Sequence, residues 1–100
     1  MGKYEDVEQQ YRQRLAMVEA DLDTAMALLR LAQTDLNLGQ PSRLGEMLTK
    51  ARAAQQHAEK FLTEVKDPET RQRLHYKQQA VLENIGDVER RRVRQEAECE

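Results

Sequence analysis

The chain has no tryptophan, one cysteine, two prolines and four glycines among its 100 residues. One cysteine cannot form a disulfide within the chain, so we expect no disulfide framework. Cys99 also stands between Glu98 and Glu100, whose charges disfavour a thiolate and argue against a catalytic thiol. The sequence contains no glycine-rich phosphate loop, no nucleophile elbow and no Ser/His/Asp spacing. We therefore predict that the protein is not an enzyme.

Long apolar runs and an excess charge of one sign are missing as well. No apolar run approaches the roughly 18 residues that a membrane-spanning helix needs, and residues 1–6 lack the apolar region of a signal peptide. Lys and Arg number 16 against 18 Asp and Glu, which gives a net charge of −2. This balance makes no overall electrostatic case for nucleic acid or an anionic membrane as a partner. We expect a cytoplasmic protein that does not associate with membranes.

Metal ligands are sparse. His57 and His75 are the only histidines, and neither has a second His or Glu four residues away on the same helix face. A zinc or iron site needs three or four ligands in a defined arrangement. The sequence therefore predicts ordinary surface histidines, with no metal site and no cofactor.

What the chain does have is the composition of long helices. Charged residues make up 34% of it, and Ala, Glu, Leu and Arg are abundant, as in coiled coils. Gly39 and Pro41 are typical of a helix end, and Ser42 suits the N-cap of the next helix. Asp67 and Pro68 suit the cap and first position of a third helix. We predict one all-α domain over residues 1–100, a three-helix antiparallel up-down-up bundle with coiled-coil-like heptad packing and helices at about 4–38, 43–66 and 68–96.

Each predicted helix carries an apolar seam with heptad spacing. The first seam is Leu15, Val18, Leu22, Ala25, Leu29, Ala32 and Leu36. The second is Leu44, Met47, Ala51, Ala54, Ala58, Phe61 and Val65. The third is weaker, with Leu74, Val81, Ile85 and Val88 apolar but Gln78 and Arg92 at positions that continue the seam. Gly86 also costs that helix about 1 kcal/mol relative to Ala.

Two groups of apolar residues have no assured partner within the chain. The second helix is shorter than the first, so the first ten or so residues of the first helix should extend past it, with Tyr4, Val7 and Tyr11. A second apolar face lies nearly opposite the first seam and consists of Met17, Ala20, Ala27, Leu31 and Leu38. A frayed end and isolated surface leucines are one interpretation.

The other interpretation is a binding surface for a second subunit or another helical protein. We take this one as the functional prediction. The protein is then a non-enzymatic interaction or scaffold module that self-associates, with a homodimer or another helical protein as its partner. The interface residues that we predict are Tyr4, Val7, Tyr11, Leu31 and Leu38.

A cluster of arginines near the carboxyl end offers an alternative. It consists of Arg90, Arg91, Arg92 and Arg94. A run this short is usually a solvated helix face, and it lacks the interleaved aromatics of a nucleic-acid-binding surface. The alternative function is a small nucleic-acid-associated regulator that uses this cluster, although we do not expect nucleic acid to be a partner.

Residues 31–58 resemble one tetratricopeptide-type helical hairpin. Leu31 and Ala32 precede Gly39, a small turn follows, and Leu44 and Ala51 lie beyond it. The family usually has Ala where Leu44 stands, and no 34-residue period recurs in this chain. The resemblance implies binding of a protein or peptide in a groove.

Overall fold

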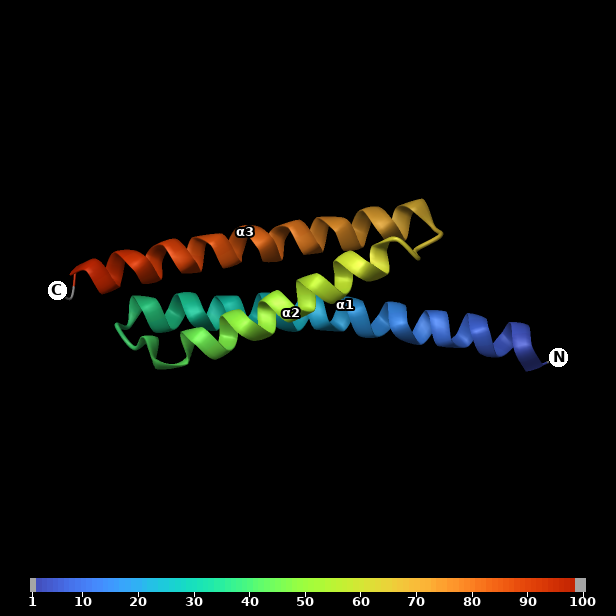
Figure 1. Cartoon of the computed structure of the whole chain (residues 1–100), viewed down its shortest axis with the longest axis horizontal. Coiled ribbons are helices and arrows are strands. Elements are labelled where there is room, and N and C mark those ends of the chain that lie inside the picture. The colour runs from blue at the N-terminus through green and yellow to red at the C-terminus, as the bar shows by residue number, and fades with distance from the viewer. Residues whose placement is uncertain (1, 99–100) are drawn as a thin grey trace.

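The structure, a computed structural model, describes the backbone of residues 2–98 and the side chains of residues 6–40 and 42–97. Within these residues the chain forms three α-helices and a 3-10 turn, with no strand. The elements are α1 (Gly2–Asn37), η1 (Pro41–Arg43), α2 (Leu44–Leu62) and α3 (Pro68–Glu98). Figure 1 shows α2 returning along α1 and α3 running back again. The predicted all-α, three-helix antiparallel bundle is confirmed.

The core follows the predicted seams. Every seam residue of α1 is buried except Leu15, which is half-buried against the core. The apolar seam residues of α2 and α3 are buried too, and Val65 is buried although it lies beyond the end of α2. Heptad spacing therefore identified the residues that hold the three helices together.

Helix α1 ends close to Gly39 and Pro41, as the sequence predicted. The Gly39 backbone adopts a φ of 70°. The Gly39 N–H donates to the Leu36 carbonyl at 3.1 Å, and the Gln40 N–H donates to the Asp35 carbonyl at 2.8 Å. These two bonds form a Schellman motif, in which a left-handed residue satisfies the last helix carbonyls.

The helix boundaries around α2 differ from the prediction. Ser42 lies in η1, and the N-cap of α2 is Arg43, without a side-chain capping bond. The helix ends at Leu62, four residues earlier than expected, and 3-10-type bonds such as Glu64 N–H to the Phe61 carbonyl (2.8 Å) tighten its last turn. Residues 63–67 form the connection to α3, and Asp67 at its end directly precedes Pro68, a position that disfavours the helical conformation.

The start of α3 is as predicted. The Asp67 carboxylate accepts hydrogen bonds from the Thr70 N–H at 3.2 Å and the Thr70 hydroxyl at 2.6 Å. The helix then continues through Gly86. Gln78 is buried at its seam position, where its amide donates to the Gln55 side-chain oxygen at 3.1 Å. A polar residue is therefore accommodated in the seam because it has a hydrogen-bond partner.

The three helices make a long, thin molecule. Its principal extents are 65 × 21 × 16 Å, and its radius of gyration is 16.7 Å. None of the helices within residues 2–98 combines the length and the apolar character needed to cross a membrane. Because only three helices surround the core, every helix keeps one face toward solvent.

Candidate interaction face

The amino-terminal part of α1 is covered further than the sequence suggested. Tyr11 is half-buried and packs on Phe61, with ring centroids 5.9 Å apart. The Lys66 N–H donates to the Tyr11 hydroxyl at 3.2 Å. The expectation that Tyr11 lacks a partner within the chain is therefore wrong, because the last turn of α2 and the segment after it both contact Tyr11. Val7 is 65% exposed, and the side chain of Tyr4 lies outside the described residues.

The face of α1 opposite its seam carries large apolar side chains in solvent. Leu31 is 47% exposed and Leu38 is 65% exposed. Met17, which the predicted interface omitted although it lies on the same face, is 61% exposed. Ala20, Thr24 and Ala27 lie between these residues and are exposed as well.

Helix α3 occupies another side of α1 through charged contacts. Glu19 accepts hydrogen bonds from Arg73 at 2.9 Å and pairs with Lys77 at 3.1 Å, and Lys77 also pairs with Asp23 at 2.9 Å. The hydrogen bond from Arg73 lowers the pKa of Glu19, with Lys77 acting in the same direction. The hydrogen bonds that Lys77 donates to Asp23 and Glu19 raise the pKa of Lys77. Helix α3 therefore covers this side of α1, whereas Met17 lies at the outer edge of the contact between α1 and α2.

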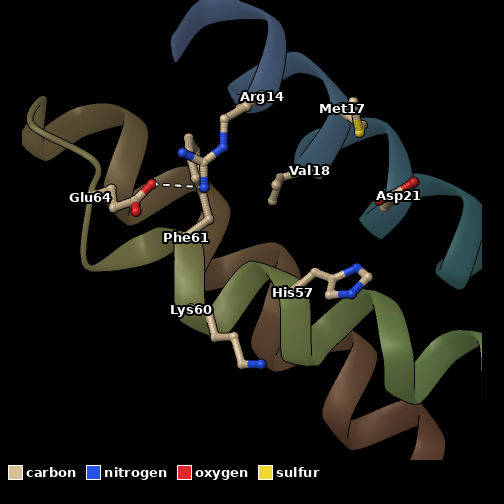
Figure 2. Close-up of a pocket in the computed structure, with 8 residues that line it drawn as sticks. All are labelled: Arg14, Met17, Val18, Asp21, His57, Lys60, Phe61 and Glu64. Atoms are coloured by element: carbon tan, nitrogen blue, oxygen red, sulfur yellow. Dashed lines mark ion pairs between the residues drawn. The ribbon is translucent and has the colours of Figure 1, made fainter. Parts of the chain in front are cut away.

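Two adjoining depressions follow the outer edge of the α1–α2 contact. The first, of about 260 Å³, is drawn in Figure 2 and is lined by Arg14, Met17, Val18, Asp21, His57, Lys60, Phe61 and Glu64. The second, of about 250 Å³, is lined by Asp21, Thr24, Ala25, Leu28, Lys50, Ala53, Ala54 and His57. Because both include Asp21 and His57, they form one shallow groove, which we call the α1–α2 groove.

Two ion pairs fix the register of α1 against α2. Arg14 pairs with Glu64 at 2.9 Å, and Arg43 pairs with Asp35 at 3.2 Å, a carboxylate that is largely buried. The Arg14 guanidinium also lies 5.0 Å from the centre of the Phe61 ring. The number of residues from Arg14 to Asp35 equals the number from Arg43, just before α2, to Glu64, just after it, so the two pairs give the same offset at both ends of the groove.

The α2 side of the groove is charged. Its exposed outer stripe consists of Glu46, Lys50, Ala53, His57 and Lys60. Lys50 pairs with Glu46 one turn away at 3.1 Å, and both side chains stay more than half exposed. The face that combines α1 and α2 therefore has exposed apolar side chains on α1 beside a stripe on α2 that carries Glu46, Lys50 and Lys60.

The arginine cluster does not form one basic surface. Arg90 pairs with Asp87, and Arg92 pairs with Glu96. Arg91 donates instead to the side-chain oxygens of Gln33 and Asn37 on α1. Arg94 is exposed. Three of the four arginines thus have partners within the chain, and Arg91 contributes to the packing of α3 on α1.

The described side chains contain no group of three or more His, Cys, Asp or Glu residues placed to bind a metal ion. His57 lies in the α1–α2 groove and His75 on the exposed side of α3. In comparisons with known proteins, no family model, no curated protein and no solved structure matches the chain.

Proposed function

We propose that this protein is a non-enzymatic interaction module that binds helical protein surfaces, including a further copy of itself, through the face formed by α1 and α2. The mechanism is burial of apolar helix surface in a shared helical interface. The resemblance of residues 31–58 to a tetratricopeptide-type hairpin agrees with this proposal but adds little weight to it.

The observation that supports this proposal is the exposure of two large apolar residues on α1 and one directly after it, beside a groove. Met17 and Leu31 are 61% and 47% exposed, and Leu38, the residue that follows α1, is 65% exposed. Large apolar side chains that gather on one face can mark a site where another protein binds. A bundle with a thin core also gains stability when association buries more of its surface.

The experiment is absolute mass by light scattering over a range of protein concentrations, with reductant present so that Cys99 cannot cross-link copies. We expect a mass above that of the 11.7 kDa chain as concentration rises. Leu31→Glu should reduce this mass, because it places a charge in the buried face. Tyr76→Glu is the matched control, since Tyr76 is an exposed apolar residue on α3.

A monomer at every concentration that also binds no helical partner would contradict the proposal. An equal loss of mass in Leu31→Glu and Tyr76→Glu would contradict its assignment to the α1–α2 face.

The nucleic-acid alternative stays a prediction of the sequence. The side-chain partners of Arg90, Arg91 and Arg92 within the chain do not favour it. It would be supported by a salt-dependent shift of a labelled duplex that is lost when the four arginines are replaced by alanine.

A further inference from the structure

We propose that the partner of the α1–α2 face is the same face of a second copy, in an antiparallel twofold dimer centred on Thr24 and Ala53. This inference rests on the proposed function and specifies its partner and geometry. It follows from the placement of apolar and charged residues at equal distances on either side of these two positions.

The exposed face of α1 is self-complementary about Thr24. Met17 and Leu31 each lie seven residues, or about two helical turns, from Thr24 on opposite sides. When two α1 helices run antiparallel and cross at Thr24, Met17 of one copy meets Leu31 of the other, and the converse pair follows by symmetry. The side chains at the centre are small, so the two helix axes can approach closely. These small residues are Ala20, Thr24 and Ala27.

The exposed stripe of α2 is self-complementary in charge. Glu46 and Lys60 each lie seven residues from Ala53 on opposite sides, and both are exposed. An antiparallel pair of α2 helices centred on Ala53 therefore brings Glu46 of one copy to Lys60 of the other, twice by symmetry. Opposite charges that meet across an interface favour one orientation over its alternatives.

The two centres lie at the same level of the molecule, which a single twofold axis requires. The register set by the Arg14–Glu64 and Asp35–Arg43 pairs places residue 24 opposite residue 54. Residue 54 is the immediate neighbour of Ala53, so the offset is about 1.5 Å along a helix. Thr24, Ala53 and Ala54 also line the same part of the α1–α2 groove.

The other twofold arrangement, with the axis along the helices, lacks this match. It would place α2 of one copy on α1 of the other, so Glu46 and Lys60 would lie at the levels of Leu31 and Met17, and burying a charge against apolar side chains is unfavourable. The charges on α2 therefore select the antiparallel orientation, and the apolar residues on α1 supply the buried surface.

The size of the face sets the expected strength of the dimer. The stretch from Met17 to Leu31 spans roughly 21 Å at 1.5 Å per residue, and the molecule is 21 Å across at its second extent. Such a face covers roughly 400 Å², about half of the 800 Å² that each partner buries in a standard interface. We therefore expect a weak, transient dimer whose population rises with protein concentration.

A charge swap tests the pairing of Glu46 with Lys60. Glu46→Lys and Lys60→Glu should each weaken the dimer about tenfold, because each replaces both attractive pairs with like charges. The double variant restores opposite charges with reversed signs, so its dissociation constant should return to within about threefold of that of the original chain. Sedimentation equilibrium gives the constants, and circular dichroism checks that each variant stays folded.

A cross-link tests the position of the twofold axis independently of charge. In a Cys99→Ser background, Thr24→Cys places one thiol beside its symmetry mate, close enough for a disulfide between the copies. Mild oxidation should therefore give a covalent dimer. Gln79→Cys, on the exposed side of α3, is the matched control and should stay monomeric on a non-reducing gel.

The outcomes separate this inference from the proposed function. A dimer that is insensitive to the charge swap and does not cross-link at position 24 would overturn the twofold geometry, while self-association itself would stand. A chain that stays monomeric at high concentration but captures another helical protein through Leu31 would likewise overturn the dimer and keep the interaction module. A monomer with no partner at all would overturn both.

Discussion

At the scale of single residues, Gln78 is the polar exception in an apolar seam. It is buried, and its amide is satisfied by Gln55, which is only half-buried. In Gln78→Leu the Gln55 amide can turn to water, so the variant loses one hydrogen bond and gains apolar burial. We expect the free energy of unfolding to rise by up to about 1 kcal/mol in urea denaturation. A fall by a similar amount would mean that Gln55 cannot reach solvent.

Gly86 and Gly39 give opposite predictions for the same substitution. A Cβ at Gly86 would lie 3.2 Å from the end of the Arg90 side chain, which is long, exposed and able to shift. Gly86→Ala should therefore stabilise the protein by about 0.5–1 kcal/mol through helix propensity. Gly39→Ala should destabilise it by about 1 kcal/mol, because the φ of 70° strains any residue with a Cβ. Thermal melts of the two variants should shift in opposite directions.

At the scale of the helices, Asp67 and Ser42 were both predicted as N-caps, but only Asp67 makes capping hydrogen bonds. Asp67→Ala removes the acceptor of two hydrogen bonds at the start of α3 and should cost about 1 kcal/mol. Ser42→Ala should change the stability by less than about 0.5 kcal/mol, since α2 has no side-chain cap. Denaturant midpoints of both variants measure the difference. Equal losses would show that Ser42 caps α2 in solution.

The contact between α1 and α3 should weaken in acid. Glu19 has a pKa below its ordinary value of 4.5 in the folded protein, because Arg73 and Lys77 stabilise its charge. As the pH falls through this range, the unfolded chain takes up the proton first, so the free energy of unfolding decreases. Since the pair is partly exposed, we expect Glu19 to contribute only about 0.5 kcal/mol to this decrease.

Chemical denaturation at pH 7 and pH 3 measures this contribution. The pH dependence of the free energy of unfolding should be smaller in Glu19→Gln than in the original chain. Glu59→Gln, on the exposed side of α2, is the control and should leave it unchanged. An identical pH dependence in both variants would contradict a role for Glu19.

Sequence spacing predicted the helices and the core, because heptad periodicity is a local property of each helix. Val18, Leu22 and Val81 were assigned to the core on this basis and are buried. Tyr11 was assigned to a free end, although Phe61 in the last turn of α2 packs on it and the Lys66 N–H, beyond the early end of α2, donates to its hydroxyl. That contact depends on where the chain turns, and the turn was the least predictable part of the sequence.

At the scale of the whole molecule, the candidate face could be predicted only in part. The exposure of Leu31 and Leu38 follows from their place opposite the seam, which the sequence alone indicates. The charges that α2 adds to the groove require the register between two helices, which the sequence of neither helix contains. The ion pairs Arg14–Glu64 and Asp35–Arg43 supply that register.

The elongated shape affects how the mass should be measured. A globular chain of 100 residues has a radius of gyration of about 13 Å, whereas this molecule has 16.7 Å over a length of 65 Å. A rod experiences more friction than a sphere of equal mass, so the monomer should elute early from a sizing column calibrated with globular standards. Its apparent mass on that column should exceed 11.7 kDa, while light scattering of a dilute sample gives the true value. An elution volume alone would therefore overstate the mass and would not distinguish an elongated monomer from a dimer.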